Sequence, residues 1–238
     1  LFVFFIAGLL TDSKSLGQVV ISAVAAAAHV IILVFSKDLG SAVIFFAGYL
    51  IMVFIATKNY FYLFAGILGG AGASIVAYHM FSHVRTRVIA FLHPWSNIND
   101  SGYQITQSLF AIGTGGWFGL GIDQGDPTSI PYVEQDFVFS AVAEEMGVIF
   151  GICLILVCVS CFIVFMKIAM QLKEDFYRYI AVGISTIYIF QVFLTIGGGT
   201  RFIPLTGVTL PLVSYGGSSV LTTIIMFGII QGLYCIQS

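Results

Sequence analysis

The fold is decided by MGVIFGICLILVCVSCFIVFM, residues 146–166, an apolar stretch without a charged side chain. A helix needs about 20 such residues to cross the hydrocarbon core of a bilayer. Further apolar runs of similar length lie near residues 18–35, 40–57, 60–78, 178–198 and 218–236, and residues 1–10 look like the end of another helix. The alternation of a transmembrane β-barrel does not occur. The sequence therefore predicts an all-α, polytopic transmembrane helical bundle with about seven spans.

The composition supports this class. Hydrophobic residues make up 59% of the 238 residues and charged residues 8%, whereas about a quarter of an average soluble domain is charged. Such a chain has too little polar surface for a water-soluble enzyme, and its net charge of −2 offers no basic field to a nucleic acid. Because Leu1 stands in an apolar run without a Met or signal peptide before it, we expect an N-terminally truncated fragment forming a single membrane domain over 1–238.

Two irregular stretches interrupt the apolar pattern. Residues 79–145 are polar and rich in Gly and Pro, and residues 197–219 contain two prolines and six glycines. Non-helical backbone at membrane depth is tolerated only where protein or a wet cavity surrounds it. We therefore expect the two stretches to face each other across a cavity. If Lys167, Lys173 and Arg178 are cytoplasmic, the alternation of spans makes residues 79–135 an extracellular loop.

Asp136 is the first candidate for chemistry, because it stands where the polar stretch turns back into the membrane. Its neighbours Phe137, Val138 and Phe139 would desolvate the carboxylate, which raises its pKa and improves it as a general base. The alternative is a helix N-cap, since Asp is a favoured cap and an apolar helix follows.

Glu144 and Glu145 are ionisable residues next to a spanning run, so a functional or paired role is expected for them. If the helix is continuous from Asp136, residues 136, 140 and 144 share a face and Glu145 points away. The helical rise would then separate Asp136 from Glu144 by about 12 Å. Paired carboxylates of glycoside hydrolases are only about 5–9.5 Å apart, so the sequence favours Asp136 acting alone.

Three arginines are candidates for binding an anion. Arg85 and Arg87 directly follow a span, where they could snorkel to lipid phosphates or clamp a phosphate or pyrophosphate. Arg201 lies inside the second irregular stretch, away from a predicted helix end, which favours a ligand role.

Histidines and aromatic residues give weaker signals. His79 and His83 have the i, i+4 spacing of a metal pair, but without an HExxH glutamate interfacial histidines are the simpler interpretation. Trp95, Trp117 and Tyr103 fit an aromatic membrane belt as well as a sugar platform.

Five elements follow one another along the chain: SKDLGSA (36–42), RVIAFLHPW (87–95), GYQITQSLFAIGTGGWFGLG (102–121), DFVFSAVAEEMG (136–147) and FIPLTGVTLPLVSYGGSS (202–219). In this order they resemble the SEDS family (shape, elongation, division and sporulation) of RodA-, FtsW- and SpoVE-like proteins. The resemblance covers nearly the whole chain. It departs from the family pattern in the loop over 121–137, where many relatives carry a lysine, and at Thr195-Ile196, where many have Asn-Ile.

The resemblance implies a peptidoglycan glycosyltransferase of the bacterial plasma membrane. Such an enzyme polymerises lipid II at the outer face, releases undecaprenyl pyrophosphate, and works with a class B penicillin-binding protein amid membrane lipid. It also implies Asp136 as the essential carboxylate. The residues then expected to bind substrate are Arg85, Arg87, Gln104, Gln107, Glu144, Arg201 and Ser218.

The implied reaction needs few groups. A single inverting displacement requires one base at the sugar hydroxyl and cationic groups at the pyrophosphate. Arg87 and Arg201 could be these cationic groups. A divalent cation, Mg or Mn, could share the neutralisation, although no ligand cluster identifies one. Two other classes stay open: a lipid II flippase, which would not need a base at Asp136, and a non-catalytic scaffold for a penicillin-binding protein.

Overall fold

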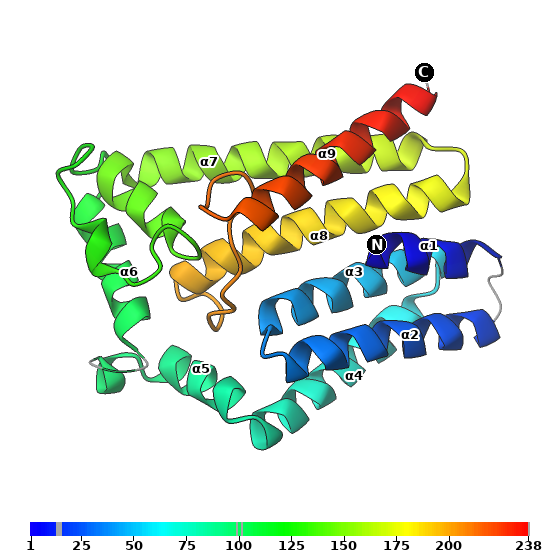
Figure 1. Ribbon diagram of the computed structural model, residues 1–238, viewed down its shortest axis with the longest axis horizontal. Coiled ribbons are helices and arrows are strands. Elements are labelled where there is room, and N and C mark those ends of the chain that lie inside the picture. Colours follow the sequence, from blue (N-terminus) through cyan, green and yellow to red (C-terminus); the bar gives the residue numbers. More distant parts are fainter. Residues whose placement is uncertain (13–15, 99, 101, 238) are drawn as a thin grey trace. The chain divides into compact units, whose positions relative to one another are not determined.

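The computed structural model describes residues 1–12, 16–98, 100 and 102–237, and within these ranges it contains helices and no β-strand. The α-helices are α1 (Phe2–Asp12), α2 (Leu16–Phe35), α3 (Leu39–Thr57), α4 (Tyr60–Met80), α5 (Ser82–Leu92), α6 (Tyr103–Gly115), α7 (Val138–Gln171), α8 (Asp175–Gly199) and α9 (Gly217–Gln237). Two short 3₁₀ helices are η1 (Trp95–Asn97) and η2 (Pro127–Ser129). Figure 1 shows their order along the chain.

Six helices of the described chain are long and apolar enough to cross a membrane, namely α2, α3, α4, α7, α8 and α9, and α1 is a shorter apolar helix. The predicted all-α bundle is confirmed, and each predicted apolar run falls within one of these helices. The polar stretch over 79–145 is not simply a loop, because it contains α5 and α6. These helices have 11 and 13 residues, too few to span a bilayer.

The described chain divides into two compact units that each join segments distant in the sequence. The first comprises Leu1–Ile75, Ser160–Phe190 and Leu221–Ser238, and the second comprises Val76–Val159 and Gln191–Val220. Several long helices contribute residues to both units. The single membrane domain and the extracellular location of 79–135 stay predictions.

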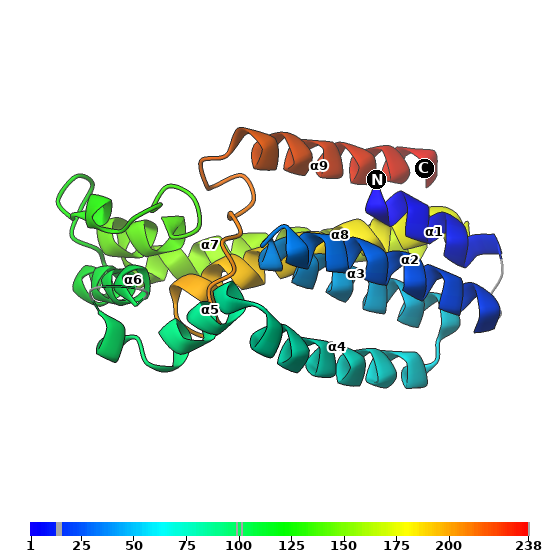
Figure 2. The same ribbon diagram turned by 60° about the horizontal axis from the view of Figure 1, so that its bottom comes forward.

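The first unit is an apolar helical bundle. Helices α1, α2 and α3 lie side by side in Figure 1 and in Figure 2. Phe165, Tyr188 and Phe227, from α7, α8 and α9, pack edge to face with ring centroids 4.8–5.7 Å apart. Asp38 caps α3 by accepting a hydrogen bond from the Ser41 amide (3.0 Å). The SKDLGSA element therefore contains the N-cap of α3.

The second unit has a small core that ties its helices together. Ala111 of α6 packs with Ile130 and Phe137 of the following loop. Close by, the Ser108 hydroxyl donates to the Gly199 carbonyl (2.7 Å) and lies 2.6 Å from the Ser140 hydroxyl. These buried polar contacts join α6, α7 and the end of α8, because a buried hydroxyl must find a partner.

Helix α7 is broken at Gly147, which has the non-helical dihedrals φ 86° and ψ 166°. The loop after α6 supplies the missing backbone partners. The Leu120 amide donates to the Glu144 carbonyl (2.9 Å), and the Val148 amide donates to the Gly116 carbonyl (3.0 Å), with two further bonds of the same kind beside them. The condition of a helix that is continuous from Asp136 is therefore not met, because α7 begins at Val138. At Gly147 the loop after α6 supplies the hydrogen bonds that the broken helix lacks.

Candidate active site

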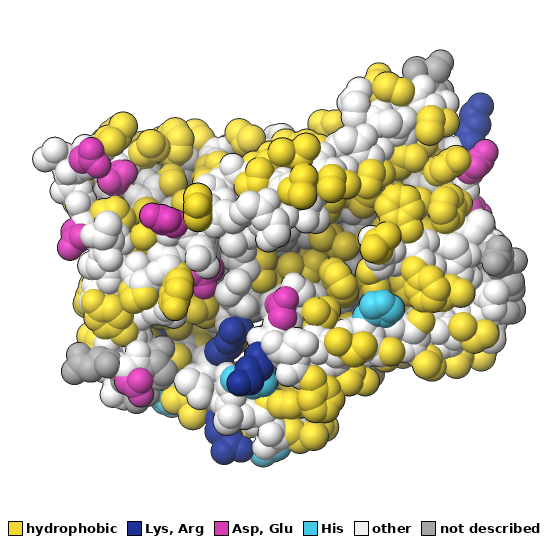
Figure 3. All heavy atoms as spheres, viewed as in Figure 1, with side chains coloured by type: hydrophobic (Ala, Val, Ile, Leu, Met, Phe, Trp, Pro, Cys, Tyr) yellow, Lys and Arg dark blue, Asp and Glu magenta, His cyan; other side chains and the backbone are white. Residues whose placement is uncertain are grey.

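A cavity of about 360 Å³ lies in the second unit. Its walls come from α5, α6, the loop before α7 and the irregular segment after α8. The residues that line it are Thr86, Arg87, Ala90, Gln104, Ile105, Tyr132, Asp136, Leu205 and Gly207. The two irregular stretches of the sequence thus face each other across a cavity, as predicted. Figure 3 shows hydrophobic side chains over much of the visible face, with charged side chains few and scattered.

The turn that carries Asp136 is anchored on both sides. Ile130 and Phe137 are 1% and 0% exposed and hold the turn over 131–136 between them. The Phe137 carbonyl accepts a first-turn hydrogen bond of α7, from the Ser140 amide (2.9 Å). Phe137 therefore occupies the cap position and Asp136 precedes it.

The carboxyl group of Asp136 has the properties of a base. Its Oδ1 is buried and accepts no hydrogen bond from the described residues. Burial raises the pKa of Asp136 from 3.8 to about 6, against the opposing effects of a backbone hydrogen bond and of the Arg87 charge. A capping Asp would use its oxygens on amides of the first helical turn. The geometry therefore favours the general-base interpretation over the helix cap.

Arg87 lines the same cavity as this carboxyl group, and Gly207 lies close to both. Its Nη1 donates to the carbonyls of Leu205 (3.3 Å) and Thr206 (2.9 Å), so the irregular segment curves around the guanidinium. Gly207 has a φ of 75°, and a Cβ built there would lie 3.8 Å from Arg87 Nη2 and 4.0 Å from Asp136 Oδ2. The glycine thus brings the backbone close to both a cation and a carboxylate, at a conformation that other residues rarely adopt.

The end of the irregular segment holds the two residues before Asp136. The Ser214 hydroxyl donates to the Gln135 carbonyl, and the Tyr215 amide donates to the Glu134 carbonyl (2.7 Å). The SYGG element therefore positions the backbone that carries the proposed base.

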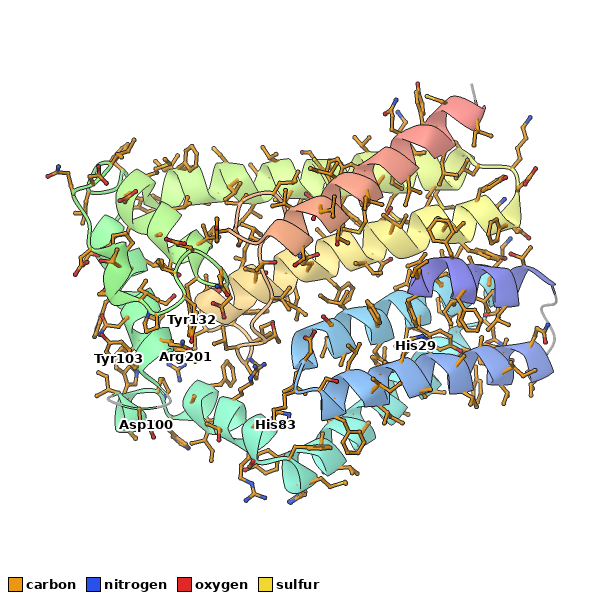
Figure 4. The ribbon with its side chains drawn as sticks, viewed as in Figure 1. His29, His83, Asp100, Tyr103, Tyr132 and Arg201 are labelled. Carbon is orange, nitrogen blue, oxygen red and sulfur yellow. The ribbon has the colours of Figure 1, made fainter. Side chains whose placement is uncertain are left out.

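Two of the predicted arginines do not line the cavity. Arg201 has a φ of 57°, and its guanidinium donates to the carbonyls of Phe91 (3.1 Å) and Leu92 (3.4 Å) at the C-terminal end of α5 (Figure 4). Arg85 is exposed and donates to the His79 carbonyl (3.3 Å). Arg201 thus fastens the irregular segment to α5, and Arg85 points away because it is two residues from Arg87 on the same helix.

The other predicted substrate-binding residues fall in different places. Gln104 lines the cavity, whereas Gln107 of the same helix and Ser218 at the start of α9 are outside its lining. Glu144 is only 7% exposed, and its Oε1 accepts a hydrogen bond from the Asp126 amide (3.4 Å). Its Oε2 has no partner among the described residues. Glu144 therefore fastens the loop between α6 and α7.

A metal site made of protein side chains is not formed by the described residues, which contain no group of three or more His, Cys, Asp or Glu that could hold an ion. His79 ends α4 and His83 lies in α5, so their spacing does not describe one helix face. Asp136 is the sole carboxylate among the described residues of the cavity wall. A Mg²⁺ or Mn²⁺ ion there would need phosphate oxygens of a substrate as further ligands.

Two features of the site were not predicted. Tyr132 lines the cavity, although nothing in its sequence neighbourhood distinguishes it from an exposed loop residue. The break of α7 has a sequence signal, since Gly147 interrupts an otherwise apolar helical run. Its location in space depends on a loop more than twenty residues earlier, which no local pattern reveals.

Comparisons with known proteins connect this site to a family. The sequence profile of the family described as cell cycle proteins of the FtsW/RodA/SpoVE type matches residues 1–236. The protein named peptidoglycan glycosyltransferase RodA of Mycobacterium tuberculosis is 38% identical over 200 residues, covering 84% of this chain and 42% of its own. The probable peptidoglycan glycosyltransferase FtsW of Francisella salina is 39% identical over 210 residues, covering 84% and 51%.

A sporulation protein and a solved structure are also similar. Stage V sporulation protein E of Bacillus subtilis is 32% identical over 203 residues, covering 84% of this chain and 55% of its own. The chain spans about half the length of the curated relatives it matches. A chain from a solved peptidoglycan synthase complex shares the fold with a TM-score of 0.82 at 24% identity, over 99% of this chain and 68% of that one. With six candidate spans and a profile match over nearly its whole length, this chain is a multi-pass bacterial membrane protein and belongs to the FtsW/RodA/SpoVE family.

Proposed function

We propose that this protein is a peptidoglycan glycosyltransferase that polymerises lipid II at the outer face of the bacterial plasma membrane. The observation that carries the proposal is that Asp136 and Arg87 line one cavity, both close to Gly207. The names of the relatives RodA and FtsW support the reaction class.

In the proposed reaction the acceptor sugar hydroxyl gives its proton to Asp136 while its oxygen attacks the anomeric carbon of the donor. The bond from that carbon to the pyrophosphate oxygen breaks, and its electron pair leaves with undecaprenyl pyrophosphate. The configuration at the anomeric carbon inverts. The buried Oδ1 of Asp136, which accepts no hydrogen bond from the described residues, is suited to take the proton. Arg87 is the cation among the described lining residues, and it would stabilise the charge of the pyrophosphate.

The proposed partners follow from the same chemistry and from the relatives. Lipid II and undecaprenyl pyrophosphate are the proposed substrate and product. A class B penicillin-binding protein is the proposed protein partner, which the similarity in fold to a chain of a peptidoglycan synthase complex supports. A divalent cation, Mg²⁺ or Mn²⁺, is a proposed cofactor that would be held mainly by oxygens of the substrate pyrophosphate and would supply positive charge to the leaving group.

A lipid II flippase is the second candidate, since an irregular segment beside a polar cavity also suits a transporter. A scaffold for a penicillin-binding protein would need neither the cavity nor its charges. The names of the relatives RodA and FtsW, which both include peptidoglycan glycosyltransferase, favour the enzyme.

The test uses the purified full-length protein together with a class B penicillin-binding protein whose own active site is inactivated. With lipid II as substrate, the enzyme is expected to give glycan chains and to release undecaprenyl pyrophosphate. A flippase would move lipid II across the membrane of a proteoliposome and make no polymer. Transport without polymer would overturn the proposal.

A further inference from the structure

Tyr132 is an exposed aromatic residue on the wall of the Asp136 cavity. Its side chain is 66% exposed and belongs to the lining, four residues before Asp136 in the same loop (Figure 4). Among the described lining residues it is the only aromatic one. Tyr132 therefore borders both the cavity and solvent.

The backbone at Tyr132 is strained. Its φ is 61°, in the left-handed region, where bulky residues are rare and Gly or Asn is the usual choice. The turn is nevertheless well defined, because the Gln135 amide donates to the Tyr132 carbonyl (2.9 Å) and the Val133 amide donates to the Ile130 carbonyl (3.2 Å).

The residues around Tyr132 form an apolar core that does not include it. Ile130, Val133 and Phe137 direct their side chains into the apolar core of the second unit. Tyr132 is not part of that core and is 66% exposed. The ring contributes nothing to that core, so folding gives no reason for a strained tyrosine at this position. Strain held by a rigid surrounding structure at a cavity wall points to binding.

The chemistry of the cavity limits the ligand. A polar wall with Asp136, Arg87 and Gln104 suits a ligand rich in hydroxyl groups and bearing a negative charge. A flat, stiff aromatic ring offers apolar contact at low entropic cost, and the C–H face of a pyranose ring is the part of a saccharide that needs such contact.

We propose that Tyr132 stacks on the pyranose ring of the acceptor saccharide and orients the hydroxyl that faces Asp136. This rests on the proposed function, since the saccharide is that of lipid II. Tyr132 thus acts as a binding residue that selects and positions the acceptor sugar.

The experiment compares Tyr132→Phe, Tyr132→Leu and Tyr132→Gly in the full-length protein. Lipid II affinity is measured in the Asp136→Asn background so that no turnover occurs, and the KM for lipid II is measured with Asp136 intact. Tyr132→Phe keeps the ring, so its lipid II affinity and its KM should stay within about twofold of the wild-type values. Leu and Gly remove it and should weaken affinity and raise KM roughly three- to tenfold, with kcat changing less.

The thermal midpoint separates binding from folding. Gly relieves the strain, so Tyr132→Gly should leave Tm unchanged or raise it by up to about 3 °C. Lys58→Gly is the matched control, because Lys58 is exposed with a φ of 53° and lies in the first unit. It should show the same change in Tm with normal lipid II affinity.

Normal affinity in Tyr132→Gly and Tyr132→Leu would overturn the stacking role, as would an equal loss in Tyr132→Phe. If Tyr132→Gly lowers Tm, the comparison of Phe with Leu still decides the question. A wild-type protein that makes no glycan would instead overturn the proposed function, whatever the Tyr132 variants do.

Discussion

The burial of Asp136 has two opposing effects. It lowers the stability of the folded protein when the carboxyl group ionises, and it makes the carboxylate a stronger base. Oδ1 has no hydrogen-bond partner in the described structure, and the pKa of Asp136 is raised to about 6. A purely structural carboxylate is instead paired or hydrogen-bonded. Asp136 therefore has the features of a functional residue whose burial lowers the stability of the folded protein.

The pH dependence of stability tests this view. A raised pKa favours the protonated folded state, so this stabilisation is full below the unfolded value near 3.8 and is lost as pH rises through about 6. Asp136→Asn never ionises. Its Tm should therefore exceed that of wild type by at least about 2 °C at pH 7.5, with the difference shrinking toward pH 4.5. A difference that does not change with pH would show that Asp136 is not desolvated.

The sequence could predict Asp136 and Arg87, because each residue's chemistry and position at the end of a span are local features. It could not show that Arg85 faces away or that Arg201 binds the carbonyls that end α5. Those outcomes depend on which helix face meets the cavity and on where a distant segment returns. Tyr132 shows the same limit, since its left-handed backbone arises from the packing of the whole turn.

At the scale of elements, the break in α7 is the main irregularity of the long helix that follows Asp136. The loop after α6 takes the place of a helical turn, so this loop is held against α7 by backbone hydrogen bonds on both sides of Gly147. Apolar spans are predictable because hydropathy is a property of a continuous window. The break in α7 cannot be predicted in this way, because its hydrogen-bond partners come from another part of the chain.

Gly147→Ala should disrupt this arrangement. A Cβ at Gly147 would lie 2.5 Å from the Gly119 amide nitrogen, and the φ of 86° is unfavourable for Ala. We expect a loss of about 3 kcal/mol or more in unfolding free energy, because backbone atoms must move. Gly113→Ala in α6 is the control, since nothing lies within 4 Å of its added Cβ. That variant should be neutral or up to about 1 kcal/mol more stable. Equal stabilities in chemical denaturation would contradict the proposed role of the break.

At the scale of the whole molecule, the six apolar helices make the chain a membrane protein. Its orientation, with the loop over 79–135 outside, stays a prediction from its charges. Helix α7 connects the loop that precedes Asp136 to the turn at Lys173. A helix of this length and hydropathy crosses the bilayer once, which puts its two ends on opposite sides. The proposed function requires the end of α7 next to Asp136 to be the outer one.

Cysteine labelling tests that orientation. In a full-length variant whose four native cysteines are replaced by Ala, Gln124→Cys should react with an impermeant thiol reagent added to intact cells. Lys173→Cys, on an exposed turn at the other end of α7, should react only after permeabilisation. The opposite pattern would place the cavity on the cytoplasmic side and remove the external active site.

The central claim is that Asp136 removes a proton during glycan synthesis, and one measurement tests it most directly. Glycan formation by full-length Asp136→Asn, with lipid II binding and Tm measured on the same sample, separates chemistry from binding and folding. A general base predicts a rate lower by roughly 10²–10⁴ with binding and folding retained. Near-normal glycan formation by a folded Asp136→Asn variant that binds lipid II would contradict the account.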